Sequence, residues 1–109
     1  MHPELLVVPD CPNGATAAHL FRQALDAAGF SDREFETITV DTEEDARARR
    51  FFGSPAFMVN GQDLFGTPEM APGVSCRMYL TASGRITGTP DLEELITRVQ
   101  RAAEISDAS

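Results

Sequence analysis

Short apolar runs and helical apolar stripes alternate along this chain, and this alternation limits its fold more than any other feature. Residues 4–8 (ELLVV) form a largely apolar run that stops at a proline, as a buried strand would. From about Pro12 to Ala28, apolar side chains recur at helical spacing, and the glycine that follows is a typical helix end. Residues 35–40 then alternate in polarity and predict a second strand.

A second helix and a hairpin are predicted next. Thr42 is expected to cap a short helix that carries acidic residues in its first turn and ends near Phe51 or Phe52. Residues 56–59 form a third apolar run. Asn60-Gly61 follows this run and is a strong hairpin signal, with residues 62–65 as the return strand.

The remaining residues predict a loop, a strand and a last helix. Residues 66–73 are rich in glycine and proline, as loops are, and residues 75–81 resemble a strand before a turn at 82–84. Thr89 and Pro90 are expected to begin the last helix, with Thr89 as its cap. Residues 105–109 are expected to form a frayed tail.

This order predicts an α/β fold in which helices flank a mixed sheet. The elements follow one another as strand, helix, strand, helix, two hairpin strands and helix, with the run at 75–81 as a further strand. The chain has 109 residues, enough for one domain and not comfortably for two. We therefore expect residues 1–109 to form a single domain.

The charge balance excludes one large class of function. Lys and Arg number 9 against 17 Asp and Glu, so the net charge is −8, whereas general nucleic-acid binding needs a basic surface. The longest apolar run, residues 5–8, is too short to cross a membrane. The first residues also lack the basic region and apolar stretch of a signal peptide. We expect a cytoplasmic protein with no nucleic-acid or membrane partner.

Cys11 and Cys76 are the two cysteines of the sequence, and in a reducing compartment a structural disulfide is not expected. Cys11 lies between the first strand and the first helix. Unpaired N–H groups at a helix start stabilise a thiolate and raise its nucleophilicity. Asp10 opposes this effect, because an adjacent carboxylate disfavours a second negative charge. A reactive thiol and a cysteine that only packs at a helix start both remain open.

Gly53-Ser54-Pro55 lies directly before the third apolar run. Bonds that precede proline are the only peptide bonds that are cis at appreciable frequency, and a proline that opens a strand is one place for them. The isolated dipeptide nevertheless favours the trans form.

Residues 7–14 (VVPDCPNG), residues 53–57 (GSPAF) and the order of the elements resemble the thioredoxin-like superfamily. The resemblance implies that Cys11 is the nucleophile and that a cis-proline loop at Pro55 faces it. It further implies that the Ser54 backbone holds a thiol-bearing substrate by main-chain hydrogen bonds. Pro12 and Asn13, beside the cysteine, complete the expected substrate-binding residues on this side.

The motif departs from that family at one position. Gly14 stands where thioredoxins carry their second cysteine, so dithiol exchange through that motif is excluded. The chemistry then belongs to Cys11 alone or to Cys11 with Cys76 as a distant partner. The loop before Cys76 could bring this residue to the site or leave it at the far edge of the sheet. The alternative to a partner role is that Cys76 is a small, buried apolar side chain.

Arg49 and Arg50 end the predicted second helix, near the proline loop of the fold that this chain resembles. Arg50 is therefore a candidate for holding an anionic substrate such as glutathione. The alternative is a solvated helix end, where cations suit the helix dipole.

Three functions compete. The first is a thiol oxidoreductase acting on a thiol- or disulfide-bearing small molecule or protein, in which Cys11 attacks and Cys76 or an external thiol resolves the adduct. The second is soft-metal or organomercurial handling by Cys11, Cys76 and Asp10, as in alkylmercury lyases. The third is a non-catalytic interaction module. No cofactor is expected, and no Cys or His pair has the spacing of a resident metal site.

Overall fold

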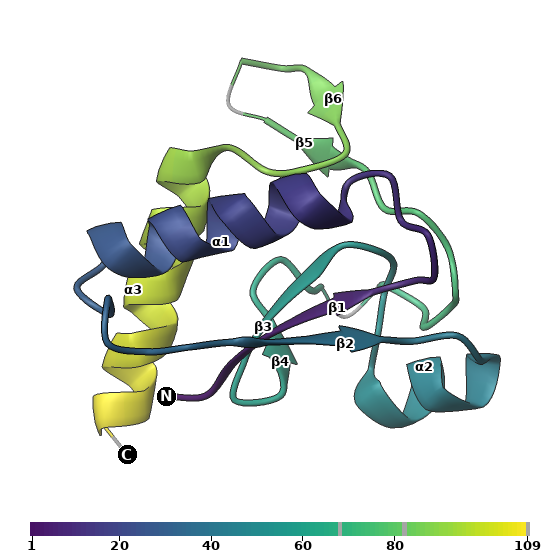
Figure 1. Cartoon of the computed structure of the whole chain (residues 1–109), viewed down its shortest axis with the longest axis horizontal. Helices are drawn as coiled ribbons and strands as arrows, with labels where there is room; N and C mark the ends of the chain where they lie inside the picture. Colours follow the sequence, from purple (N-terminus) through teal and green to yellow (C-terminus); the bar gives the residue numbers. More distant parts are fainter. Residues whose placement is uncertain (68, 82, 109) are drawn as a thin grey trace.

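The computed structural model describes residues 1–67, 69–81 and 83–108 (Figure 1). Within these residues a four-stranded sheet forms in the order β2-β1-β3-β4. Its strands are β1 (Pro3–Val7), β2 (Glu36–Thr39), β3 (Ala56–Val59) and β4 (Gln62–Asp63). β1 runs parallel to β2 and antiparallel to β3, which in turn runs antiparallel to β4. The prediction of an α/β fold with a mixed sheet is confirmed.

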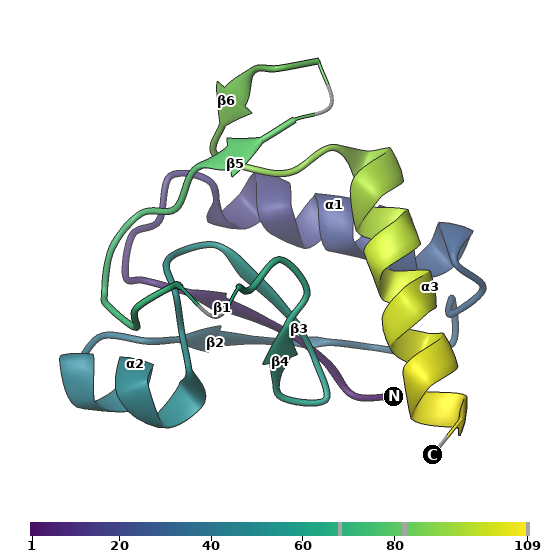
Figure 2. The same ribbon diagram turned by 180° about the vertical axis from the view of Figure 1, so that it is seen from behind.

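Helices cover both faces of this sheet, as the opposite views of Figures 1 and 2 show. α1 (Gly14–Ala27) and α3 (Leu92–Ala108) pack on one face, and α2 (Glu43–Arg49) packs on the other. Successive side chains of a strand point to opposite faces, so Leu5 and Val7 join the first core while Leu6 joins the second. The first core also contains Phe21, Leu25, Phe57, Leu95 and Val99, and the second contains Val40, Ala46, Phe51, Ala56 and Met58.

The cap predicted for α2 is confirmed. The backbone N–H of Asp45 donates to the Thr42 hydroxyl at 3.0 Å, which satisfies one of the free donors of the first turn. The carboxylate of Asp45 also pairs with Arg49 one turn later, at 3.0 Å. The helix ends at Arg49 because Arg50 takes a left-handed conformation, with φ 55°, slightly earlier than the sequence indicated.

The predicted hairpin is present but its return strand is short. Asn60 and Gly61 both have positive φ, 53° and 79°, as the favoured two-residue hairpin turn requires. β4 nevertheless stops at Asp63 instead of continuing to Phe65. The N–H of Phe65 donates to the Asp63 carboxylate at 2.8 Å, and that of Gly66 donates to the Asp63 carbonyl at 3.2 Å. Leu64 still donates its N–H to the Phe57 carbonyl at 2.9 Å, and these bonds turn the chain away from β3 after it.

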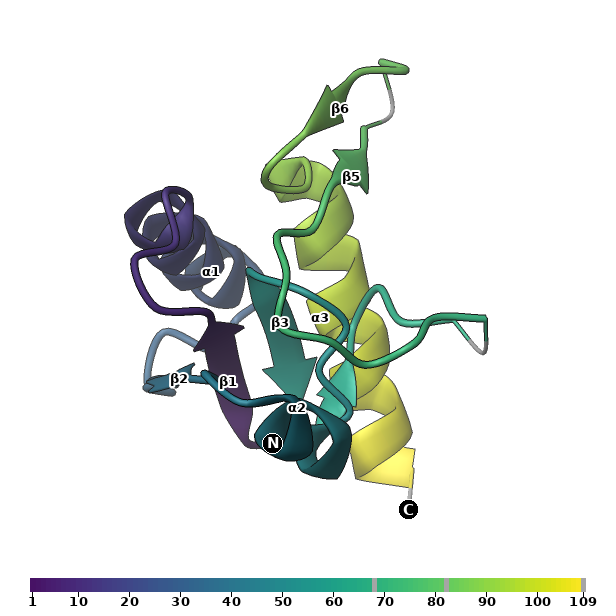
Figure 3. The same ribbon diagram turned by 90° about the vertical axis from the view of Figure 1, so that its right-hand side faces the viewer.

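The strand predicted over residues 75–81 is correct only at its end. β5 (Tyr79–Leu80) pairs with β6 (Ile86–Thr87) in a separate two-stranded ribbon, which projects beyond the rest of the fold (Figure 3). Met78, Leu80 and Ile86 are 62 %, 70 % and 65 % exposed on this ribbon. Of the predicted turn at 82–84, residue 82 lies outside the described residues.

α3 begins later than predicted. Its first turn is closed by the N–H of Leu95, which donates to the carbonyl of Asp91 at 3.0 Å, so Thr89 is not the cap. The Thr89 carbonyl instead accepts from the Thr87 hydroxyl at 2.5 Å. The helix continues to Ala108, through residues that the sequence predicted as a frayed tail, and Ser109 is outside the described range. Among the described residues, no helix is long and apolar enough to cross a membrane.

Candidate functional site

Cys11 follows a tight turn at the end of β1. Its N–H donates to the carbonyl of Val8 at 3.3 Å, and the two residues between are Pro9 and Asp10. Proline suits the first central position of such a turn, and a type II turn needs positive φ at the second, where Asp10 has φ 56°. The turn directs the half-buried, free thiol of Cys11 against the core on the α1 face.

The start of α1 lies farther from Cys11 than the sequence predicted. Asn13 is the N-cap residue and Gly14 is the first helical residue, so Pro12 lies outside the helix. The Gly14 N–H donates to the Cys11 carbonyl at 3.2 Å. The effect of a helix dipole weakens beyond the first turn. The dipole of α1 therefore stabilises a thiolate at Cys11 less than it would stabilise one at the first residue of the helix.

The two residues after Cys11 differ in their surroundings. Pro12 is exposed. Asn13 makes no capping hydrogen bond with its side chain, which lies instead against Gly88, where an added Cβ would come within 2.3 Å of the Asn13 amide nitrogen. The loop after β6 therefore packs against one side of Asn13, which is half-buried, whereas Pro12 is exposed.

Ser54 and Pro55 lie at the same end of the sheet as Cys11. The peptide bond between them is cis, as the resemblance implied. The β1–β3 register pairs Leu6 with Ala56, and continuing it by two residues sets Val8 opposite Ser54. The Val8 N–H accordingly donates to the Ser54 hydroxyl at 3.0 Å. This bond ties the chain just before Cys11 to the chain just before β3.

The main-chain groups of Ser54, which were expected to hold a substrate, are already paired within the protein. Its N–H donates to the carbonyl of Ser75 at 2.8 Å, and its carbonyl accepts from the N–H of Arg77 at 2.9 Å. Cys76, between these two residues, forms a parallel β-bridge with Ser54. We call residues 75–77 the strap. The strap uses both main-chain groups that were expected to hold a substrate, and Ser54 is fully buried.

Cys76 is brought beside Ser54, and it is exposed and free, so a buried apolar role is excluded. Side chains alternate along an extended segment, so its thiol and the buried side chain of Arg77 point in opposite directions. Among the described residues, no three His, Cys, Asp or Glu side chains come close enough to hold a metal ion together. Asp10, Cys11 and Cys76 therefore do not form such a three-residue cluster, and Asp10 is an exposed turn residue. Handling of a soft metal by the two thiols stays a prediction.

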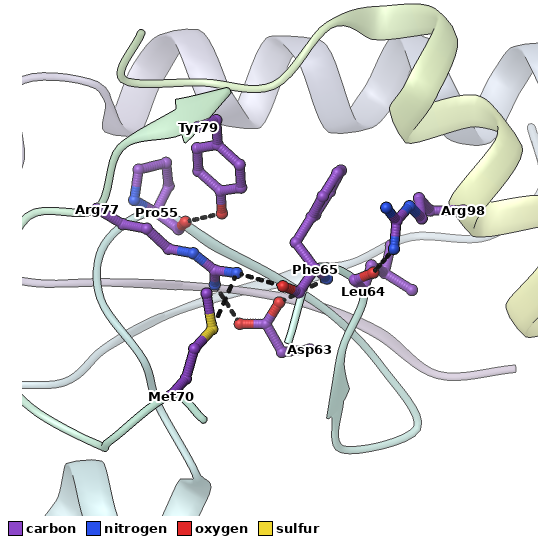
Figure 4. Close-up of polar contacts among 8 residues, drawn as sticks. All are labelled: Pro55, Asp63, Leu64, Phe65, Met70, Arg77, Tyr79 and Arg98. Atoms are coloured by element: carbon purple, nitrogen blue, oxygen red, sulfur yellow. Dashed lines mark hydrogen bonds and ion pairs between the residues drawn. The ribbon is translucent and has the colours of Figure 1, made fainter. Parts of the chain in front are cut away.

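Arg77 is a central residue of this region, and its buried cluster was not predicted from the sequence. Its guanidinium is buried, forms an ion pair with Asp63 and donates to the Phe65 carbonyl at 2.9 Å (Figure 4). It also lies 4.8 Å from the centre of the Tyr79 ring, within the range of a cation–π contact. Asp63 ends β4, Phe65 follows it and Tyr79 begins β5, so no local pattern indicates the cluster. Together they fix the strap from beneath.

Tyr79 holds the other side of the proline loop. Its hydroxyl donates to the carbonyl of Pro55 at 2.5 Å, and its ring packs among Phe57, Phe65 and the first core. Burial raises the pKa of Tyr79 well above its usual range; Arg77 opposes this shift, and Asp63 adds to it. The phenol is therefore a neutral hydrogen-bond donor at physiological pH.

Arg50 lies elsewhere. It lines an open hollow of about 350 Å³ together with Phe52, Gln62 and Thr67, and it also borders a second hollow beside Met58. Both hollows include Gly61. Gly61 lies in the β3–β4 turn, at the opposite end of β3 from Ser54. The structure thus places Arg50 near the β3–β4 turn, and its role in holding an anionic substrate at Cys11 stays a prediction.

No protein-family model matches the chain, and neither a curated protein nor a solved structure is significantly similar to it. The geometry therefore carries the functional interpretation. A free, half-buried thiol lies at one end of a mixed sheet, beside a proline loop whose backbone is sealed by the strap. Such a thiol acts as a nucleophile when it is ionised.

Proposed function

We propose that the chain is a thioredoxin-like thiol protein whose reactive group is Cys11 alone. The strand order supports this, with β1 parallel to β2, antiparallel to β3 and covered by helices on both faces. The observation that carries the proposal is the position of Cys11. Its thiol is free and follows β1 directly, and Val8 joins this loop to the residue before Pro55.

The reaction that this site supports is thiol–disulfide exchange through one cysteine. The Cys11 thiolate attacks one sulfur of a disulfide RS–SR′, forms the mixed disulfide Cys11–S–S–R and releases R′S⁻. A second thiol, R″SH, then loses its proton and attacks the R sulfur, which yields R–S–S–R″ and regenerates the Cys11 thiolate. Because residue 14 is glycine, the thiol that resolves the mixed disulfide comes from outside the Cys11 motif. We propose that it is the thiol of a separate molecule and not that of Cys76.

Mass spectrometry with glutathione disulfide tests this proposal. In the Cys76→Ser protein, we expect one glutathione adduct at Cys11 that excess reduced glutathione removes. The Cys11→Ser protein is the matched control, since it keeps the more exposed Cys76 and should form the adduct more slowly. Equal or faster labelling of the Cys11→Ser protein would contradict a special role for Cys11.

One observation favours a non-catalytic interaction module as the second candidate. Met78, Leu80 and Ile86 expose apolar surface on the projecting β5–β6 ribbon, and grouped exposed apolar side chains often mark protein contacts. The same adduct measurement separates the two candidates, because an interaction module has no need of a reactive Cys11. An unreactive Cys11 in a folded protein would favour the module.

A further inference from the structure

We propose that the strap, residues 75–77, restricts the site at Cys11 to low-molecular-weight partners and excludes extended polypeptides. This inference rests on the proposed thiol chemistry at Cys11. It concerns which class of disulfide or electrophile reaches the thiol, and it derives from how the main chain around Ser54 is hydrogen-bonded.

Extended polypeptides bind sheets by adding a strand to an edge with unpaired N–H and C=O groups. The sheet ends at β2 on one side and at β3 and β4 on the other. The edge that concerns the proline loop is the outer side of β3 and of the residues before it, where Ser54 lies. β4 covers one end of this edge, where Met58 pairs with Asp63. The N–H of Leu64 donates to the carbonyl of Phe57 at 2.9 Å in the middle. The strap covers the remaining end at Ser54.

The strap leaves no free main-chain pairing position at Ser54. Ser75 and Arg77 use the N–H and the C=O of Ser54, at 2.8 and 2.9 Å. A polypeptide that adds a strand here must pair with the outer side of the strap, which lies one strand spacing, about 4.8 Å, farther from Cys11. Small disulfides need no such pairing, so the strap does not hinder them.

Buried contacts keep the strap in place. The Arg77 side chain, only 5 % exposed, pairs with the Asp63 carboxylate, only 1 % exposed. Gly53 lies directly beneath the strap, since an added Cβ there would come within 3.0 Å of the Arg77 Cβ. A peptide that displaces the strap must therefore break a buried ion pair and expose a close-packed backbone contact. Such a displacement is disfavoured.

Two activated disulfides that carry the same thionitrobenzoate leaving group test the proposal in the Cys76→Ser protein. One is built on N-acetylcysteine amide, and the other on the central cysteine of an extended peptide of alternating apolar and polar residues. We expect the peptide to react with Cys11 no faster than the small compound. A peptide rate about tenfold higher, equivalent to about 1.4 kcal/mol of strand pairing, would overturn the proposal.

Hydrogen exchange gives a second readout. We expect the amide protons of Ser54 and Arg77 to be protected in the free protein and to stay protected in the peptide adduct. Loss of protection at Arg77 in that adduct would show that the peptide displaces the strap, which also contradicts the proposal. If neither compound modifies Cys11 of a folded protein, the proposed thiol function fails and this inference fails with it.

Asp63→Asn provides a variant that loosens the strap. It removes the negative charge that pairs with Arg77 and keeps the shape of the side chain. We expect the ratio of peptide rate to small-compound rate to rise in this variant. Asp45→Asn is the matched control, because it breaks an exposed ion pair with Arg49 and should leave the ratio unchanged. An unchanged ratio in a folded Asp63→Asn protein argues against the strap as the barrier. If this variant unfolds, the reaction rates and amide exchange of the Cys76→Ser protein decide whether the strap excludes the peptide.

Discussion

Arg77 and Asp63 form an ion pair from which solvent is almost excluded, with side chains 5 % and 1 % exposed. Arg77 belongs to the strap and Asp63 ends β4, so the pair joins the strap to the sheet. The guanidinium also donates to the Phe65 carbonyl and to the Met70 sulfur, at 2.9 and 3.7 Å. This cluster makes the region beside Cys11 a fixed part of the fold.

The first prediction concerns this ion pair. Arg77→Met leaves the Asp63 carboxylate buried without its cation, and removing one partner of a buried pair costs about 3–5 kcal/mol. We expect the free energy of unfolding, measured by urea denaturation, to fall by that amount. The control is Arg49→Met, which breaks the exposed pair with Asp45 and should cost about 0–1 kcal/mol. Similar losses in the two variants would show that the Arg77 cluster is not structurally central.

A second prediction separates backbone conformation from close packing at Gly53. Gly53 and Gly29 both have positive φ, 124° and 95°, but an added Cβ meets Arg77 only at Gly53 and open space at Gly29. Alanine in the left-handed region costs about 1–2 kcal/mol at either position. We expect Gly53→Ala to lose about 1–3 kcal/mol more than Gly29→Ala, since it also overpacks the contact with the strap. Thermal or urea unfolding of both variants measures this difference, and equal losses would refute the close approach of the strap.

A third prediction follows from the buried phenol. The sequence contains 1 Tyr and no Trp, so phenolate absorbance reports Tyr79 alone. Burial raises the pKa of Tyr79 above the unfolded value of 10.0. Its contribution to stability is therefore present below pH 10.0 and is lost as the pH rises toward the folded pKa. We expect no phenolate signal at pH 10 in the folded protein and its appearance together with unfolding at higher pH.

Tyr79→Phe provides the control for that titration. It removes the hydrogen bond to Pro55 and should cost about 0.5–1.5 kcal/mol at neutral pH. The stability of this variant should fall less steeply above pH 10, because the buried phenol that must ionise is gone. A phenolate signal near pH 10 without unfolding would contradict the burial of Tyr79.

The fold was predictable from the sequence where the signals are local. β3 was predicted with its observed bounds, because an apolar run is followed by Asn60-Gly61, whose turn conformation both residues favour. The cap at Thr42 was predictable for the same reason, since the hydroxyl and its partner are three residues apart. The two-residue strands β5 and β6 were missed or overextended because they are too short for periodicity to mark.

The site was predictable only in part. The turn between β1 and α1 fixes Cys11 after β1, and the proline before β3 is evident in the sequence. The strap depends on bonds between Ser54 and residues about twenty positions later, and Arg77 and Asp63 meet although they are 14 positions apart. No local propensity encodes such pairings. The surroundings of Arg50 were not predictable for a similar reason, since the path of the chain after α2 places it beside Gly61.

The relative alkylation rates of the two cysteines test the proposed function most directly. The rate constant of Cys11 in the Cys76→Ser protein is compared with that of Cys76 in the Cys11→Ser protein, both with iodoacetamide at neutral pH. Although Cys11 is half-buried and Cys76 is exposed, the proposed function predicts a faster reaction at Cys11. A Cys11 that reacts no faster than Cys76 in a folded protein would contradict it.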